Sequence, residues 1–534
     1  MTNIVICGAN GKMGQTIYRC VRDRDDCKII GGVDLNTEKY ADFPIYSSVS
    51  ELPEKPDVII DYSHPSCLSS LLEYCKTNGT PVVLATTGYS DEQISELKEI
   101  NDKYKRCLDA GKTERECVEL SVNMARDAGY RDLEEILRSG ETLKAGDKVY
   151  AVNMNKMLAL FRIGERPISE GMNILGAHID SPRIDVKQNP LYENEELAYL
   201  DTHYYGGIKK YQWVAQPLAL HGVIVKKNGE TVKVSIGEDE NDPVFVITDL
   251  LVHLAQEQLE KKASQVIEGE KLDLLIGNRP IEKADDLKKE EKDAVKQNVL
   301  NILKEMYGID EEDFYSAELE IVPAGKARDC GQDDRVCAFT SLFAMLDVTE
   351  AKKTGCCLLV DKEEIGSVGA TGMHSRFFEN TVAELIAVTE GESELKVRRA
   401  LSNSKMLSSD VSAAFDPMFA EAFEKRSSAF FANGITFNKF TGSRGKSGSN
   451  DANGEYIAAL RRTMDEAQVA YQFAELGRVD LGGGGTIAYI MANYGMEVID
   501  SGVAVLNMHA PYEVSSKADV YEAVKGYRAF LRME

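Results

Sequence analysis

The chain has 534 residues, enough for about three domains of ordinary size. Its composition, 43% hydrophobic and 28% charged, is typical of a globular protein and argues against disorder. The net charge of −25 argues against nucleic acid or an anionic membrane as a partner. The 11 cysteines are odd in number and form no Cys-x-x-Cys pair, so we expect reduced thiols. The chain opens on an apolar strand and has no run of about 18 apolar residues, so we expect a soluble cytoplasmic protein.

Short apolar segments alternate with helical segments through the first hundred residues. Strands are predicted at Asn3–Cys7, Lys28–Val33, Asp57–Tyr62 and Pro81–Ala85, which makes an α/β fold with a parallel sheet. We interpret residues 1–100 as a truncated, Rossmann-like half of a doubly wound domain. Residues 95–104 predict one continuous helix without a Pro, Gly or Ser-rich linker, and a longer α/β pattern follows.

A glycine-rich loop, G-A-N-G-K-M-G, follows the first predicted strand and precedes a helix. Gly8, Gly11 and Gly14 have the spacing that lets a pyrophosphate approach a helix N-terminus closely, with Lys12 and Met13 in the same loop. Asp34 ends the second strand, where a carboxylate accepts hydrogen bonds from the adenosine ribose and favours NADH. The alternative is a glycine turn that only packs a strand against a helix.

This first segment resembles the nucleotide-binding half of 4-hydroxy-tetrahydrodipicolinate reductase. The matching segments are the glycine loop, D-V-I-I-D-Y-S-H-P at Asp57–Pro65 and A-T-T-G at Ala85–Gly88. The resemblance implies an NAD(P)H site in which Thr86, Thr87 and Gly88 lie near the nicotinamide. The family's His-His pair, lysine and Pro-Ser-Gly-Thr substrate loop are missing from this chain, and the resemblance stops near Ile100. We therefore expect no reductase activity.

Five separated segments of the remaining chain place acidic residues or histidine after apolar runs. They contribute His178 with Asp180, Asp333 with Asp334, Glu363 with Glu364, Asp410, and His509. Side chains at the carboxyl ends of strands meet in the ligand crevice of an open α/β sheet. Because clustered carboxylates repel one another, we expect cations there, and a mixed His and carboxylate set suits zinc, cobalt or manganese.

Each of these segments also has a purely structural interpretation. A single histidine such as His178 is more often a hydrogen-bonded structural residue than a ligand. Asp333 with Asp334 is also consistent with a turn or a helix cap, and Glu363 with Glu364 is also consistent with a solvated loop. The metal-site hypothesis depends on their order and combination.

The combination resembles the aspartyl aminopeptidase family of dinuclear zinc metallopeptidases, over about residues 101–534. The bacterial branch is the most similar, through H-Y-Y-G-G-I-K-K-Y-Q-W at His203–Trp213, T-G-S-R-G-K-S-G-S-N-D-A at Thr441–Ala452 and L-G-G-G-G-T at Leu481–Thr486. The resemblance implies two zinc ions per subunit and peptide substrates. It also implies a catalytic domain of residues 101–185 and 323–534, and an inserted β-rich domain of residues 186–322 that forms dimers, which build a dodecamer.

The resemblance also implies a role for each site residue. Asp333 would bridge the two metals, Glu364 and His509 would complete one site, and His178 and Asp410 the other. Glu363 would be the general base, and Asp180 would orient His178. The chain departs from the family near Ala413, where eukaryotic members carry a histidine. Arg444 and Lys446 are candidate cations for an acidic substrate side chain, and the alternative is that both are loop charges.

We therefore interpret the chain as a chimera of a reductase-like segment and a metal-dependent aminopeptidase. The alternative is an NAD(P)-binding regulatory or redox protein whose second part is inactive. The join is natural, engineered or an error of gene assembly, and the loss of both expected boundaries favours an accident. A genomic read that fails to span codons 95–105 would support the accident, and a continuous read would contradict it.

Overall fold

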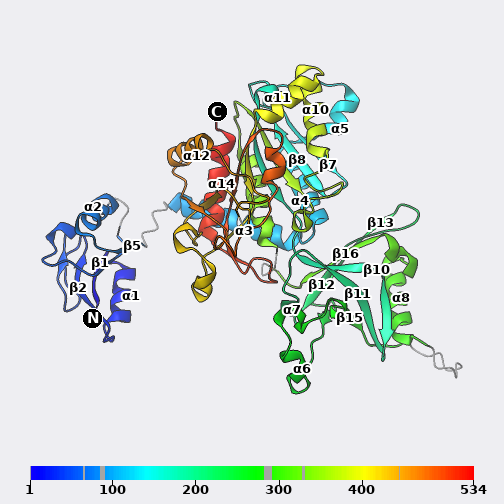
Figure 1. Cartoon of the computed structure of the whole chain (residues 1–534), viewed down its shortest axis with the longest axis horizontal. Coiled ribbons are helices and arrows are strands. Elements are labelled where there is room, and N and C mark those ends of the chain that lie inside the picture. The colour runs from blue at the N-terminus through cyan, green and yellow to red at the C-terminus, as the bar shows by residue number, and fades with distance from the viewer. Residues whose placement is uncertain (1, 64–66, 85–90, 282–291, 327–330, 444) are drawn as a thin grey trace. The chain divides into compact units, whose positions relative to one another are not determined.

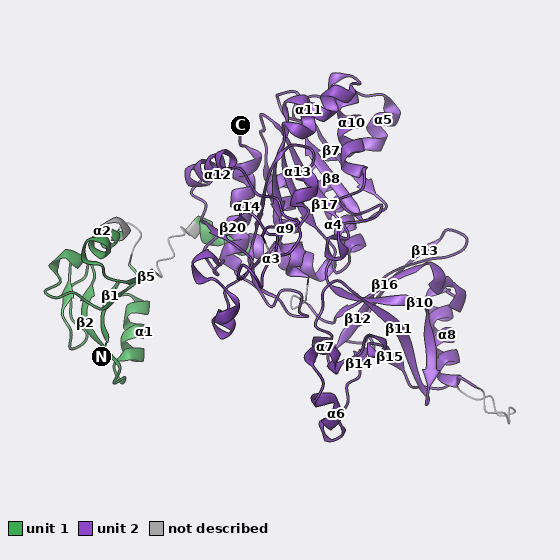
Figure 2. Ribbon diagram, viewed as in Figure 1, with its two compact units in different colours: residues 1–98 green, residues 99–534 purple. Residues whose placement is uncertain are grey.

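The computed structural model describes residues 2–63, 67–84, 91–281, 292–326, 331–443 and 445–534 (Figure 1). The chain divides into two compact units, Met1–Lys98 and Glu99–Glu534 (Figure 2). Helix α3 (Asp91–Ala110) includes residues on both sides of this division, which confirms the continuous helix expected over residues 95–104. No helix among the described residues is long and apolar enough to span a bilayer.

The first unit is built on a five-stranded parallel sheet with the order β3-β2-β1-β4-β5. Ile4 and Ile6 of β1 pack in one apolar core, and Val5 and Cys7 in another, because successive side chains of a strand point to opposite faces. The parallel, Rossmann-like sheet predicted from the sequence is confirmed. Its elements are β1 (Thr2–Cys7), α1 (Lys12–Val21), β2 (Cys27–Val33), β3 (Ile45–Tyr46), β4 (Val58–Asp61), α2 (Leu68–Asn78) and β5 (Val82–Leu84).

A nine-stranded mixed sheet forms the centre of the second unit, with the order β21-β20-β22-β18-β9-β17-β8-β7-β6. Its neighbouring strands β22, β18, β9 and β17 are parallel to one another. Both β9 and β17 are buried along their whole length, as expected of parallel strands covered on both faces. The strands are β6 (Arg131–Asp132), β7 (Lys148–Asn153), β8 (Met157–Arg162), β9 (Met172–His178), β17 (Thr354–Val360), β18 (Lys405–Ser409), β20 (Ile435–Asn438), β21 (Tyr471–Ala474) and β22 (Glu497–Gly502).

Helices cover this sheet. An apolar core joins alternate residues of β17 (Cys356, Leu358 and Val360) to α5, α10, α11 and α13, whereas α9 and α14 also contact β9 but contribute nothing to that core. The sheet therefore lies between two helical layers. The helices are α4 (Glu114–Asp127), α5 (Leu133–Ser139), α9 (Gln332–Asp347), α10 (Phe377–Glu390), α11 (Glu394–Ser402), α12 (Gly454–Glu466), α13 (Ala488–Ala492) and α14 (Lys517–Leu531).

A seven-stranded antiparallel sheet lies in the middle of the second unit's sequence, with the order β13-β12-β16-β10-β11-β15-β14. It has its own apolar core, in which Trp213 is fully buried, and α8 (Ala294–Tyr307) contacts β10 and β11 (Figure 1). The strands are β10 (Arg183–Asn194), β11 (Leu197–Tyr205), β12 (Leu218–Val225), β13 (Thr231–Ile236), β14 (Val246–Ile247), β15 (Leu274–Gly277) and β16 (Ala317–Pro323). A small sheet joins β19 (Ser412–Ala413), β23 (Ala504–Leu506) and β24 (Val514–Ser515).

Candidate metal centre

Three adjacent parallel strands of the nine-stranded sheet end at the candidate site. His178 is the last residue of β9, Asp410 directly follows β18, and Glu363 and Glu364 lie in the 3-10 turn that follows β17. Because parallel neighbouring strands end at the same sheet edge, these residues come together although they are far apart in sequence.

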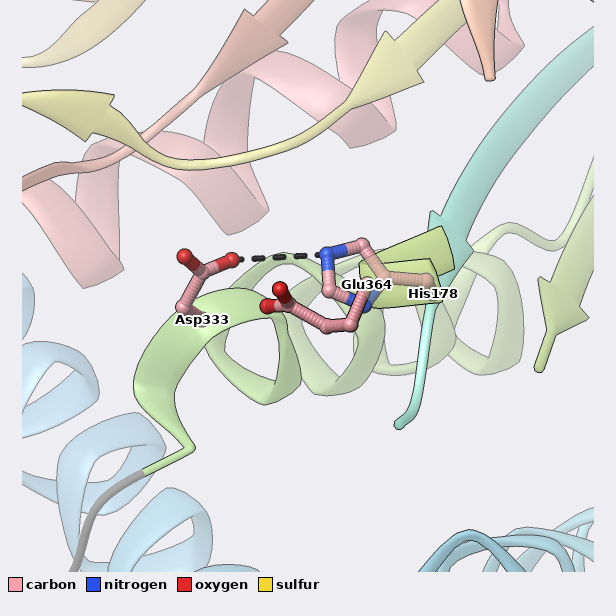
Figure 3. Close-up of side chains that lie close together, drawn as sticks. All are labelled: His178, Asp333 and Glu364. Carbon is pink, nitrogen blue, oxygen red and sulfur yellow. Dashed lines mark ion pairs between the residues drawn. The ribbon is translucent and has the colours of Figure 1, made fainter. Parts of the chain in front are cut away.

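Asp333 joins the two predicted histidines. It lies in the first turn of α9 rather than at a strand end. Its Oδ1 is 3.3 Å from Nε2 of His178, and its Oδ2 is 3.2 Å from Nε2 of His509. Figure 3 shows His178, Asp333 and Glu364 pointing toward one another. Each oxygen of this one carboxylate therefore faces a different histidine.

The remaining predicted ligands divide between the two histidines. Glu364 Oε2 is 3.6 Å from His509 Nε2, and Asp410 Oδ1 is 3.8 Å from His178 Nε2. Two groups of ligand atoms, His178 with Asp333 and Glu364, and His178 with Asp334 and Asp410, each lie within 4.8 Å of one another. The sequence did not single out Asp334 as a ligand, and the structure adds it to the cluster.

The Asp180 carboxylate contacts His178 and the turn that carries Glu363 and Glu364. Its Oδ1 is 3.3 Å from Nδ1 of His178 and accepts a hydrogen bond from the backbone N–H of Glu363 at 3.1 Å. Its Oδ2 accepts from the backbone N–H of Glu364 at 3.2 Å and from the Tyr205 hydroxyl at 2.9 Å. Although β9 ends at His178, Asp180 still faces that ring. His509 is oriented differently, because its Nδ1 bonds the carbonyl oxygen of Gly207 at 2.9 Å.

Burial disfavours the charged forms of several carboxyl groups at the candidate site. Burial raises the pKa of Glu363 to about 8, and raises the pKa values of Glu364 and Asp334 well above their usual range. Burial would also raise the pKa of Asp333, but hydrogen bonds with His178 and His509 outweigh it and hold this pKa below its usual range. Buried carboxylates at this density favour either protons or metal cations.

The polar atoms at the centre fit a metal. His178 Nε2, Glu364 Oε1 and both carboxylate oxygens of Asp334 are buried without a hydrogen-bond partner. Leaving such groups buried is costly, and imidazole with carboxylate is a donor set suited to zinc. Both histidines present Nε2 to the cluster while Nδ1 bonds an oxygen, the usual arrangement of a metal-binding histidine.

A cavity of about 460 Å³ opens on the metal cluster. Leu476, Met508 and Tyr489 give it apolar walls, and the glycine-rich segment before Thr486 forms another wall. The Thr486 hydroxyl donates to Asp500, whose buried carboxyl has its pKa raised to about 7. The cavity is large enough for an amino-acid side chain beside the cluster.

The candidate cations for an acidic substrate are not among the lining residues that the structure describes. Lys446 pairs with Asp451 at 2.9 Å and lies 3.9 Å from the centre of the Phe440 ring. Arg444 lies outside the described residues. Ala413, at the family's histidine position, is in β19. The structure therefore supplies no argument for an acidic preference.

The glycine loop of the first unit packs closely against neighbouring backbone. Gly8 has φ +76°, and a Cβ there would lie 2.5 Å from the carbonyl oxygen of Tyr62. A Cβ at Gly14 would collide with the carbonyl oxygen of Gly8, and α1, which includes Lys12 and Met13, begins directly after Gly11. A cavity of about 270 Å³ is lined by Gly8, Gly11 and Asp34, among others. Thr86, Thr87 and Gly88 lie outside the described residues.

Three residues that contact the site were not found from the sequence, and one of them is Glu513, whose carboxylate accepts from the backbone N–H groups of Asp333 and His509. Tyr205 and Gly207 come from the end of β11 and the turn after it, in the seven-stranded sheet, and contact Asp180 and His509. The only signal was their position in the long H-Y-Y-G-G-I-K-K-Y-Q-W match, which gave no hint of which partners they meet.

Comparison with known proteins gives two family matches. The family described as "Aminopeptidase I zinc metalloprotease (M18)" matches residues 107–531. The family described as "Dihydrodipicolinate reductase, N-terminus" matches residues 2–110. The two matches meet at the end of α3, about ten residues beyond the predicted join, and they confirm the two-part composition of the chain.

Individual relatives agree with this assignment. A "Probable M18 family aminopeptidase 1" of Clostridium acetobutylicum is 62% identical over 453 residues, which are 83% of this chain and 96% of the relative. The crystal structure of aminopeptidase I from the same organism has a TM-score of 0.77 and 59% identity, and the match covers 83% of this chain and 98% of that one. The mApe1 dodecamer of S. cerevisiae, at 20% identity and TM-score 0.64, shares the fold over 81% of this chain and 96% of its own. The chain therefore belongs to the M18 family of aminopeptidase I zinc metalloproteases, and the metal-dependent aminopeptidase function predicted from its sequence is confirmed.

Proposed function

We propose that this chain removes N-terminal residues from peptides with two zinc ions and Glu363 as the general base. Asp333 would lie between the ions, with Glu364 and His509 on one side and His178 and Asp410 on the other. The single observation that carries this proposal is the Asp333 carboxylate, whose two oxygens face the two histidines at 3.3 and 3.2 Å. Cobalt or manganese would suit the same donors.

A zinc pair bound there would supply Lewis-acid polarisation of the scissile carbonyl and a water of lowered pKa. Glu363 takes the proton of the attacking water and delivers it to the leaving amine. Its carboxylate lies 3.9 Å from Nε2 of His178 and lines the cavity, which supports this role because a general base must lie within reach of the water it deprotonates. Asp180 holds the Glu363 backbone, and so sets where that carboxylate lies.

The acidic lining of the cavity supports an exopeptidase. Asp410 and Glu363 line the cavity beside its apolar walls, and carboxylates attract the positively charged amino group of a peptide's first residue. An internal peptide bond offers no such charge.

We propose residues 101–185 and 323–534 as the catalytic domain and residues 186–322 as an inserted domain for self-association. Exposed apolar residues of the inserted segment support this role: Leu250, Leu251, Val252, Leu254 and Leu259. The dodecamer of the distant relative favours dimers that build the same assembly. Light scattering of the purified chain tests the proposal: a particle about twelve times the chain mass supports it, and a monomer at micromolar concentration contradicts it.

The test of the reaction is Glu363→Gln, with the exposed Glu392→Gln as a matched control. Glu363→Gln should retain zinc, because Glu363 is not a proposed ligand, yet lose release of N-terminal residues by several orders of magnitude. Glu392→Gln should match the wild type both in zinc content and in the rate at which N-terminal residues are released. Near-normal turnover by Glu363→Gln would exclude the base, and a wild type that is inactive with every metal would favour the regulatory alternative.

For the first unit we propose binding of NAD(P)H without reductase chemistry. The glycine loop and Asp34 line one cavity, which supports nucleotide binding. The Asp34 carboxylate accepts a hydrogen bond from the backbone N–H of Asn10 in that loop, and it lies where the ribose of a bound nucleotide would meet it. Calorimetric titration of the full chain should detect NADH binding that Gly8→Ala abolishes. Gly79→Ala, at a left-handed helix end of the same unit with free space, is the control. No heat of binding for the wild type would contradict the proposal.

A further inference from the structure

We propose that Tyr205 is a positioning residue of the metal centre, whose hydroxyl fixes the Asp180 carboxylate behind His178 and the Glu363–Glu364 turn. This inference rests on the proposed metal site and gives the seven-stranded sheet a part in it beyond self-association. Asp180 receives three other contacts, from His178, Glu363 and Glu364, and all of them belong to the nine-stranded sheet and its loops. The Tyr205 hydroxyl, at 2.9 Å, is the contact that comes from the other sheet.

The Tyr205 ring is itself held in place. Arg183 is its partner across strands β10 and β11, and the Arg183 guanidinium lies 4.1 Å from the ring centre. That guanidinium is buried between the carboxylates of Glu114 at 3.3 Å and Glu320 at 3.1 Å. A ring fixed by a buried ion cluster presents its hydroxyl in one place, which is what a positioning residue requires.

The two residues after Tyr205 reach the other half of the metal centre. A Cβ at Gly206 would lie 3.4 Å from the Glu364 carboxylate, and the carbonyl oxygen of Gly207 bonds His509. Three consecutive residues at the end of β11 therefore contact the groups that orient or supply both metal positions. Outer contacts of this kind set ligand orientation, and their loss typically costs about 10–100-fold in metal affinity or activity.

The test compares Tyr205→Phe with Tyr192→Phe in the full chain loaded with zinc. Tyr192 is the matched control because its hydroxyl also donates to a carboxylate of the same sheet, Asp273, at 2.6 Å and away from the site. For Tyr205→Phe we expect zinc loss to a chelator to be about tenfold faster and kcat to fall about 10–100-fold, with KM within about twofold. Tyr192→Phe should match the wild type in all three.

A double variant separates positioning from general damage. If Tyr205 acts through Asp180, then Asp180→Asn with Tyr205→Phe should lose zinc no faster than Asp180→Asn alone. Additive losses, or unchanged zinc loss and kcat in Tyr205→Phe, would overturn the proposal. A Tyr205→Phe chain that does not fold would also overturn it, because the hydroxyl would then be required for folding rather than for positioning. A wild type that holds zinc but cleaves no peptide would end the proposed function and leave the zinc test of Tyr205 valid.

Discussion

One oxygen of the Asp333 carboxylate faces His178 and the other faces His509, so that a single side chain belongs to both halves of the proposed metal centre. The sequence pattern singled out this residue with His178, Glu364, Asp410 and His509, and the family resemblance gave each of them its proposed role as a ligand. It did not predict Tyr205 or Gly207, because their roles arise only when the end of β11 is brought against the loops after β9 and β23. Long-range contacts of this kind leave no local pattern.

The position of the Asp333 carboxylate between two histidines leads to a prediction about zinc content. Asp333→Asn removes the negative charge that faces both histidines, so zinc content should fall from about two per chain to below one. Asp127→Asn, an exposed change on α4, is the control and should retain the wild-type content. Metal analysis after dialysis measures both, and two firmly held zinc ions in Asp333→Asn would contradict the shared role.

One of the charged contacts between helix α4 and the seven-stranded sheet joins Glu116 to His221. Thr113 and Glu116 form a capping box at the start of α4, and the second oxygen of Glu116 bonds Nδ1 of His221 at 2.9 Å. His221 Nε2 lies 3.0 Å from Glu238. Burial would lower the pKa of His221, but the two carboxylates outweigh it and raise this pKa to about 9.

The raised pKa predicts a pH-dependent stability. His221 is protonated in the folded chain up to about pH 9 but only up to about 6.5 when unfolded, so its contribution is complete below pH 6.5 and lost as pH rises through 9. Relative to His221→Gln, the wild type should lose about 2–3 kcal/mol of unfolding free energy across that window. Denaturant unfolding at several pH values measures this, with exposed His253→Gln as the control. Parallel pH profiles for wild type and His221→Gln would contradict it.

Secondary structure was predictable where local patterns decide it. The strands of the first unit follow from short apolar runs between turns, and the helix over residues 95–104 from its uninterrupted composition. The kinked start of α9, which holds Asp333 and Asp334, was not predictable as a helix rather than a strand end. A helix start and a strand end are both compatible with an acidic pair beside an apolar run, and only the surrounding fold decides between them.

At the scale of the whole molecule, the chain has two units with separate apolar cores. Family motifs in the sequence were sufficient to predict this composition, because each unit carries long matches to a different family. The arrangement of the seven-stranded sheet, in which β16 lies between β12 and β10, was not predictable, because strand order depends on pairings across more than a hundred residues.

Separate cores predict separate unfolding. Calorimetry of the full chain should give two transitions, and a chelator should lower only the one that belongs to residues 99–534. When zinc is added back at about 100 times its dissociation constant, the unfolding free energy of that unit should rise by about 2.7 kcal/mol. NADH should raise only the other transition. A single transition moved by both ligands would contradict independent units.

The unequal support of the two histidines has a consequence for how the enzyme tolerates mutation. His178 Nδ1 bonds the main-chain oxygen of Asp180 at 3.0 Å and also lies 3.3 Å from the carboxylate of that residue, which most substitutions at position 180 remove. His509 depends on the main-chain oxygen of Gly207, which every amino acid carries. Random mutagenesis should therefore find many inactivating substitutions at position 180. It should find few at position 207 that act by releasing the His509 ring. The oxygen that bonds the His509 ring therefore survives substitution, whereas the carboxylate beside the His178 ring does not.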